Sequence, residues 1–109
     1  MDILQREGRY ILPSNVSPIL GVEFSGIISD IGPGVAGWSV GDQVLGLAGG
    51  VNTLQISHHL SHDVIQGAYA EYIAVASTHI IKKPASLSWV QAASIPEAFL
   101  TGNWVRCDH

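Results

Sequence analysis

The side chains best able to do chemistry gather near the middle of the chain, where His58, His59, His62 and Asp63 lie close together. Imidazole and carboxylate groups are common ligands of transition metals, so the cluster suggests a small metal-binding domain. His59 and His62 would share a helix face, but no regular element is indicated on either side. The spacing matches no compact zinc signature, and a solvent loop is the favoured interpretation.

A second chemically active group stands alone in an apolar run. Glu23 lies between Val22 and Phe24 at the start of a strand-like segment. Burying a carboxylate without partners is expensive, so we expect backbone amides or a basic partner to hold Glu23 in a buried or half-buried position.

The composition describes one globular domain or less. The chain has 109 residues, of which 47% are hydrophobic and 13% are charged. A net charge of -4 gives no electrostatic footprint for nucleic acid or an anionic membrane. No apolar run approaches the roughly 20 residues of a membrane helix. The single cysteine, Cys107, cannot form an internal disulfide, so we expect a reducing, cytoplasmic location.

Apolar runs separated by glycine and proline predict a mainly β fold, a partly open barrel with short helices at its C-terminal end. A glycine-rich bend at residues 31–37 turns the chain back on itself. The predicted strands are residues 22–31, 43–47 and 68–75, with a brief extended run at 79–83; the predicted helical segments are residues 1–7, 89–93 and 97–100.

Single residues mark where these elements begin, end or bend. Gly8 is expected to end the helix predicted at residues 1–7. Ser88 is expected to cap the start of the helix predicted at residues 89–93. Pro96 suits the first turn of the last helical segment. Gly26 interrupts strict alternation and suggests a bulge or a close backbone approach. Asp42 is placed to accept hydrogen bonds from local backbone amides.

Five stretches together carry a family resemblance that each alone would not. They are residues 1–10, 20–26, 40–44, 67–72 and 92–101. In this order they resemble the N-terminal, GroES-like domain of medium-chain dehydrogenase/reductases. Within that superfamily they are most similar to the quinone oxidoreductase branch (zeta-crystallin-like and p53-inducible quinone oxidoreductase-like enzymes).

The resemblance implies a two-domain enzyme that reduces quinones or other activated carbonyl acceptors with NADPH. The present domain would form one wall of the active-site cleft, while the Rossmann domain, which holds the dinucleotide and commonly forms the dimer, is expected to be absent from this chain. The family places the residue matching Tyr10 at the cleft and the one matching Thr101 near the nicotinamide. These are the two candidate cofactor-binding residues, and no catalytic residue is assigned.

The same comparison argues against zinc. Zinc-dependent members of the superfamily have a histidine directly before the glutamate of the second motif, where this chain has Val22. Their structural zinc is held by closely spaced cysteines, whereas this chain has one cysteine. Without a soft ligand set the usual tetrahedral site cannot be built.

Two segments depart from the family pattern. Residues 51–66 separate Gly50 from Gly67, which would be adjacent in the family, and residues 105–109 diverge after a GroES-like domain of residues 1–104. The 51–66 segment begins with a valine codon and ends with a glutamine codon, which fits a translated intron. The chain is therefore expected to be a partial or mis-spliced gene product, marginally stable and inactive by itself.

Three functions remain open at this stage. The leading one is a fragment of a zinc-independent, NADPH-dependent oxidoreductase that acts on a small quinone or carbonyl substrate. The second is a GroES-like binding or regulatory module without catalysis. The third is a small metal-binding domain built on the histidine cluster.

Overall fold

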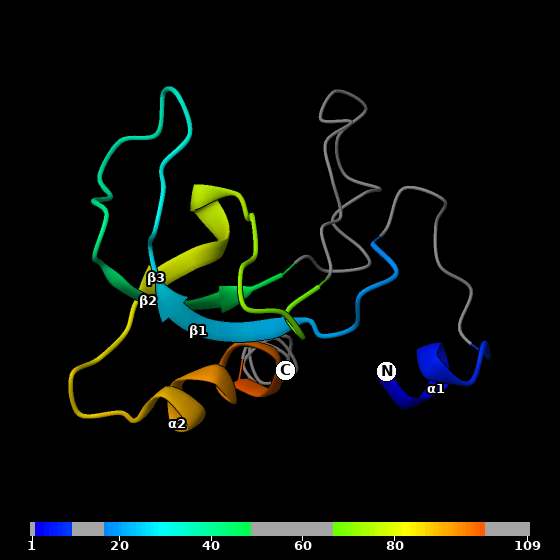
Figure 1. Ribbon diagram of the computed structural model, residues 1–109. Coiled ribbons are helices and arrows are strands. Elements are labelled where there is room, and N and C mark those ends of the chain that lie inside the picture. The colour runs from blue at the N-terminus through cyan, green and yellow to red at the C-terminus, as the bar shows by residue number, and fades with distance from the viewer. Residues whose placement is uncertain (1, 10–16, 49–66, 100–109) are drawn as a thin grey trace, which may run out of the picture. The chain divides into compact units, whose positions relative to one another are not determined.

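The computed structural model describes residues 2–9, 17–48 and 67–99 (Figure 1). The chain divides into two compact units: one comprises Met1–Val22 and Ala48–Val75, the other Glu23–Leu47 and Ala76–His109. The elements in chain order are α1 (Asp2–Arg6), β1 (Glu23–Ile27), β2 (Gln43–Leu47), the 3-10 turn η2 (Ser77–His79), β3 (Ile80–Lys82) and α2 (Trp89–Ala93). Residues 96–99 form a further helical turn.

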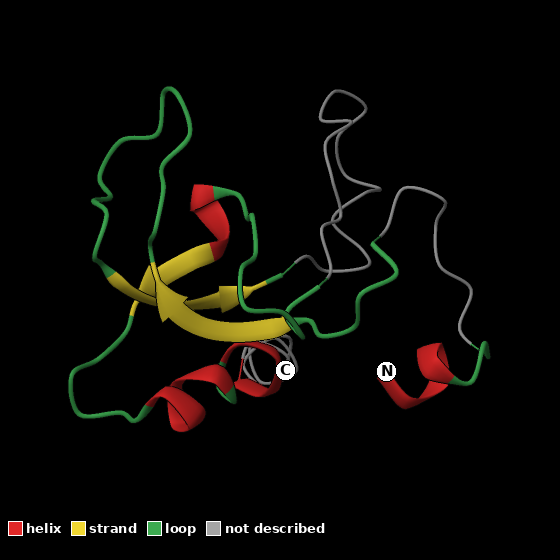
Figure 2. Ribbon diagram, in the orientation of Figure 1, coloured by secondary structure: helices red, strands yellow, loops and turns green. Residues whose placement is uncertain are grey.

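The second unit is built on a three-stranded antiparallel sheet in the order β1-β2-β3 (Figure 2). In the first pair the ladder runs from Glu23 opposite Leu47 to Ile27 opposite Gln43. In the second pair Leu45 lies opposite Ile81. The three strands form an open sheet, and the prediction of a partly open, mainly β fold is confirmed.

The two strands of the first pair lie where the sequence predicted them. β2 coincides with the predicted run at 43–47, and β1 occupies the first half of the predicted 22–31. The pairing is extended by the amide of Ile28, which donates to the carbonyl of Asp42 at 2.9 Å. A carboxylate oxygen of Asp42 accepts from the amide of Ser39 at 2.9 Å, as predicted, so the turn before β2 is closed locally.

The expected bulge at Gly26 is not present. Gly26 lies opposite Val44 in an unbroken ladder, and a Cβ added there would meet nothing within 4 Å. The close backbone approach is instead at Gly46, where a Cβ would collide with the carbonyl oxygen of His79 and lie 2.9 Å from Cγ2 of Ile80. The glycine that the sheet requires is therefore in the central strand, because that strand has a neighbour on each side.

The prediction of a strand at residues 68–75 is wrong. The amides of Gly67 and Ala68 donate to the carbonyl of Gly21, and that of Tyr69 donates to Leu20, but no ladder continues beyond them among the described residues. The third strand is β3, which lies within the brief extended run predicted at 79–83. Alternation of side chains is not sufficient for a strand, because the backbone also needs a partner, and the second edge of β2 is occupied by β3.

Two backbone hydrogen bonds in the first unit bring Ala48 and Gly67 close together, one on each side of the 51–66 segment in sequence. The amide of Ala48 donates to the carbonyl of Val22 at 2.7 Å, and that of Gly67 donates to the carbonyl of Gly21 at 3.2 Å. Residues 48 and 67 are thus both held by consecutive residues of one segment. Residues 51–66 lie outside the described residues, but their removal would leave a short link between two points already near each other.

Deleting residues 51–66 is expected to leave the fold intact and to raise the free energy of unfolding by about 1–2 kcal/mol, because a shorter loop costs less entropy to close. Urea unfolding followed by circular dichroism measures the change. The matched control replaces the segment with a Gly/Ser stretch of equal length, which should leave stability near that of the native chain. A deletion variant that fails to fold would show that these residues are an integral part of the domain.

The end of α1 and the start of α2 are formed as the sequence predicted. Gly8 has a φ of 68°, and its amide donates to Gln5 while the amide of Arg9 donates to Leu4, which is a Schellman motif. At the start of α2, Ser88 and Gln91 form a reciprocal capping box with hydrogen bonds of 3.2 and 2.9 Å.

The core of the second unit lies on both faces of β2. Val44 and Leu45 are adjacent, so their side chains point to opposite faces, and both are buried. α2 packs against β1 and β2 (Figure 2). It contributes the buried Ala92 to the core. In the described stretches of the chain, no helix has the length and apolar character needed to cross a membrane.

Candidate functional site

Glu23 is held by a backbone amide, as the sequence predicted. It is half-buried at the start of β1, and its Oε2 accepts a hydrogen bond of 3.0 Å from the amide of Glu97. Glu97 is the second residue of the helical turn at 96–99, whose first residue, Pro96, is buried. The carboxylate therefore satisfies an amide at the positive end of that turn.

Two further contacts fasten α2 to the sheet ahead of this turn. The hydroxyl of Ser25, on β1, donates to the carbonyl of Trp89 at 2.7 Å. The ammonium of Lys83 lies 4.8 Å from the centroid of the Trp89 ring, and the backbone amide of Lys83 donates to Gln43 of β2. The segment that leads towards residue 101 is thus attached to β1 at Ser25 and again at Glu23.

The two candidate cofactor-binding residues, Tyr10 and Thr101, lie outside the described residues. Thr101 comes two residues after the end of the helical turn in sequence, and Phe99 at the end of that turn is 67% exposed. The amide of Phe99 donates to the carbonyl of Ile95 at 2.9 Å, so the turn is helical up to this point. The structure therefore describes the support that precedes Thr101 in the chain.

The histidine cluster also lies outside the described residues. His58, His59, His62 and Asp63 belong to the 51–66 segment. Within residues 2–9, 17–48 and 67–99, no group of three or more histidine, cysteine, aspartate or glutamate side chains is arranged to hold a metal ion. The metal-binding interpretation gains no structural support from this part of the chain.

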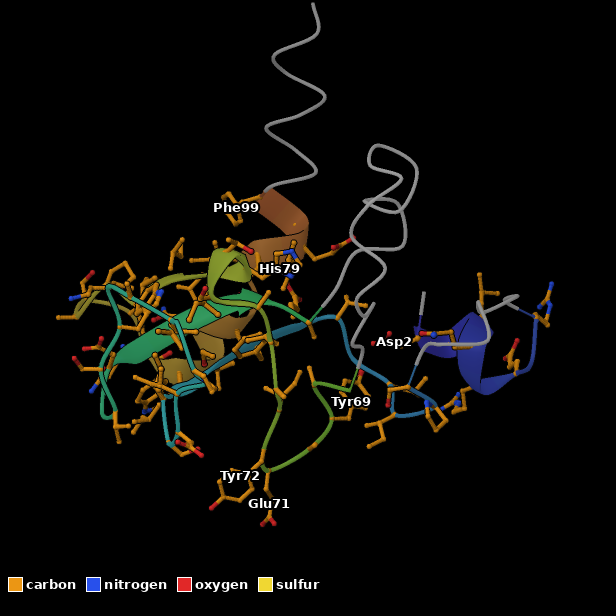
Figure 3. All side chains as sticks on the ribbon, turned by 90° about the horizontal axis from the view of Figure 1, so that it is seen from above. Asp2, Tyr69, Glu71, Tyr72, His79 and Phe99 are labelled. Carbon is orange, nitrogen blue, oxygen red and sulfur yellow. The ribbon has the colours of Figure 1, made fainter. Side chains whose placement is uncertain are left out.

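The first unit contains a tyrosine–carboxylate pair that could not be predicted from the sequence. The hydroxyl of Tyr69 donates to Oδ2 of Asp2 at 2.9 Å, and the two side chains are labelled in Figure 3. The ring of Tyr69 lies directly over Gly21, where an added Cβ would be 2.6 Å from Cδ1. The two partners are 67 residues apart in sequence, and no periodic pattern connects them.

The hydrogen bond to Asp2, and secondarily the negative charge of Asp2, raise the pKa of Tyr69 above its ordinary value of 10.0. The neutral phenol is favoured because it donates to the carboxylate. A group whose pKa is raised on folding contributes stability that is complete below its unfolded pKa. This contribution is lost as pH rises through the folded value, here above about pH 10.

Replacing Asp2 with asparagine is therefore expected to lower the pKa of Tyr69, because the amide keeps an acceptor but removes the charge. Titration of tyrosinate absorbance measures the shift, and the Tyr69→Phe variant identifies which part of the signal belongs to Tyr69. A Tyr69 pKa that is the same in the native chain and in Asp2→Asn would contradict the pairing.

One glycine pattern in the sequence has the form of a dinucleotide-binding motif, and the structure shows that it serves as a turn. Gly32, Gly34 and Gly37 have the spacing of a dinucleotide-binding fingerprint and follow a strand. In the structure this segment joins two antiparallel strands, with no helix between them. The amide of Val35 donates to the carbonyl of Gly32 at 3.4 Å, so the glycines form a turn. They do not form the phosphate cradle at a helix N-terminus that the fingerprint requires.

The fold and the sequence agree with one family. Residues 1–85 match the alcohol dehydrogenase GroES-like domain. A solved structure of the quinone oxidoreductase from Coxiella burnetii superposes on 98% of this chain and 31% of that one, with a TM-score of 0.73 and 30% sequence identity. The chain belongs to the alcohol dehydrogenase GroES-like domain family, and its open sheet matches the fold of that quinone oxidoreductase.

The curated relatives include proteins named as a reductase and as a dehydrogenase. A trans-enoyl reductase from Talaromyces variabilis is 34% identical over 96 residues, which cover 86% of this chain and 24% of the relative. A dehydrogenase from Aspergillus niger is 33% identical over 98 residues, covering 89% of this chain and 26% of the relative. The chain thus spans about a quarter of the length of these relatives.

Proposed function

We propose that this chain forms one wall of the active-site cleft of a zinc-independent oxidoreductase that transfers hydride from NADPH to a quinone or another activated carbonyl acceptor. The observation that supports this most is the likeness to the Coxiella burnetii quinone oxidoreductase along 98% of this chain. In such a reaction the nicotinamide supplies the hydride, a proton completes the reduction of the acceptor, and the protein orients both and excludes water.

Within this proposal the chain supplies the nicotinamide end of the site. Tyr10 faces the cleft and Thr101 lies close to the nicotinamide ring, both assigned from the family motifs. The dinucleotide phosphates are bound elsewhere, because the glycine turn at 32–37 joins two antiparallel strands and has no helix terminus to offer them. We therefore expect the 109-residue chain by itself to be inactive.

Zinc independence is supported by the residue that precedes Glu23. In this chain the residue before it is Val22, which has no ligand atom in its side chain. One carboxylate oxygen of Glu23 is used to hold the amide of Glu97. Hydride transfer in this proposal therefore relies on the cofactor and on positioning, without a metal that polarises the acceptor.

An NMR titration of the chain with NADPH tests the proposal. At millimolar NADPH the backbone amides of residues 10 and 101 should shift, and the shifts should be reproduced by reduced nicotinamide mononucleotide, which lacks the adenylate half. Fluorescence titration in the micromolar range should show no saturation. Shifts centred on the glycine turn at 32–37, or saturable micromolar binding, would contradict this division of the site.

A further inference from the structure

We propose that Glu23 is a positioning residue, whose carboxylate fixes the direction of the helical turn at 96–99, the turn that comes shortly before Thr101 in the sequence. This inference goes one step beyond the proposed function and rests on it for the role of Thr101. The contact itself, from the amide of Glu97 to Oε2 of Glu23, is a feature of the described residues.

The turn at 96–99 has little means of capping itself. The residue before it is Ile95, an apolar side chain that cannot accept a hydrogen bond. Pro96 has no amide hydrogen, so the first donor of the turn that needs a partner is the amide of Glu97. A single turn is marginal without tertiary support, and the partner of this donor comes from β1.

Glu23 is well placed to give that support. It begins β1 and is paired with Leu47 of the central strand, so its backbone is held by the sheet. Its side chain is half-buried, and a hydrogen bond from an amide to a carboxylate is stronger than one to a neutral acceptor. The carboxylate also lies at the positive end of the turn.

The comparison with Ser88 shows why this cap would set a direction. Ser88 caps α2 from within its own segment, since its partner Gln91 is three residues away. Glu23 and Glu97 are 74 residues apart, so their bond ties the turn to a particular point on the sheet. Loss of the Ser88 cap would weaken α2, whereas loss of the Glu23 cap would also free the turn to reorient.

The experiment compares Glu23→Ala, Glu23→Gln and the matched control Ser88→Ala in the full 109-residue chain by amide hydrogen exchange. Exchange at the amide of Phe99, relative to that of Val44 in the central strand, should be about tenfold faster in Glu23→Ala, the size expected for a lost cap. Glu23→Gln keeps an acceptor oxygen and should restore most of the protection. Ser88→Ala should leave the ratio unchanged.

A second readout links the cap to the cofactor. The shift that millimolar NADPH produces at the amide of Thr101 should fall several-fold in Glu23→Ala and return in Glu23→Gln. A native-like shift in Glu23→Ala, or unchanged exchange at Phe99, overturns the positioning role. If NADPH moves no amide in the native chain while exchange at Phe99 still responds to Glu23, the proposed function fails and the cap stands.

Discussion

Replacing Gly46 with alanine is expected to destabilise the second unit by roughly 3 kcal/mol, because overpacking against a rigid neighbour is among the costlier core changes. The added Cβ would collide with the carbonyl oxygen of His79 and lie 2.9 Å from Cγ2 of Ile80. The first of these atoms belongs to the backbone, which cannot rotate away as a side chain can. β2 and β3 would have to separate, and Leu45, buried between its neighbours, would lose packing.

Urea unfolding measures this effect, and the chain offers a matched control. Gly26 lies in the neighbouring strand β1, and a Cβ there would meet nothing within 4 Å. Gly26→Ala should therefore leave the free energy of unfolding within about 0.5 kcal/mol of the native value, as surface substitutions usually do. Equal stability of the two variants would show that β2 and β3 are not paired in the register described.

Replacing Gly21 with alanine is expected to destabilise the first unit by roughly 2–4 kcal/mol. Gly21 has a φ of 95°, a conformation that costs an L-residue about 1–2 kcal/mol. A steric cost is added, because the new Cβ would lie 2.6 Å from Cδ1 of Tyr69 and 2.9 Å from its backbone nitrogen. The ring would be displaced, so the hydrogen bond from Tyr69 to Asp2 should break.

Gly41 separates the two contributions. It has the same φ of 95°, but a Cβ there would meet nothing within 4 Å. Gly41→Ala should therefore show the backbone strain alone, about 1–2 kcal/mol. In Gly21→Ala the pKa of Tyr69 should also fall towards its ordinary value of 10.0, whereas in Gly41→Ala it should stay raised. Equal losses of stability in both variants, with an unchanged Tyr69 pKa, would rule out the contact between Gly21 and Tyr69.

Features that depend on neighbours in sequence could be predicted. The Schellman ending at Gly8, the capping box at Ser88 and the carboxylate turn at Asp42 each need only a few consecutive residues. β2 was predicted correctly because its apolar run is bounded by turn residues on one side and glycine on the other. Local chemistry was sufficient in each of these cases.

Features that depend on distant partners could not be predicted in detail. The run at 68–75 has the alternation of a strand, but among the described residues only its first two find backbone partners, at Leu20 and Gly21. Gly26 was expected to carry the close approach that Gly46 carries, because the sequence does not show which strand is central. The pair of Tyr69 with Asp2 gave no sequence signal for the same reason.

The prediction for Glu23 lies between these two groups. The cost of burying a carboxylate predicted that backbone amides or a basic partner would hold it, and the structure supplies the amide of Glu97. Which amide would do so could not be inferred, since the two residues are 74 positions apart. The family resemblance, by contrast, rested on several motifs in order, and the match over residues 1–85 confirms it.

The function proposed for this chain is tested most directly by placing it in a complete enzyme. The chimera carries this chain in place of the matching N-terminal part of the Coxiella burnetii quinone oxidoreductase, and quinone-dependent oxidation of NADPH is measured. We expect turnover, and a marked loss of turnover in Thr101→Ala and Tyr10→Phe. A chimera that folds and binds NADPH as the parent enzyme does, yet transfers no hydride to any quinone, would contradict the assignment of this chain as a wall of the reduction site.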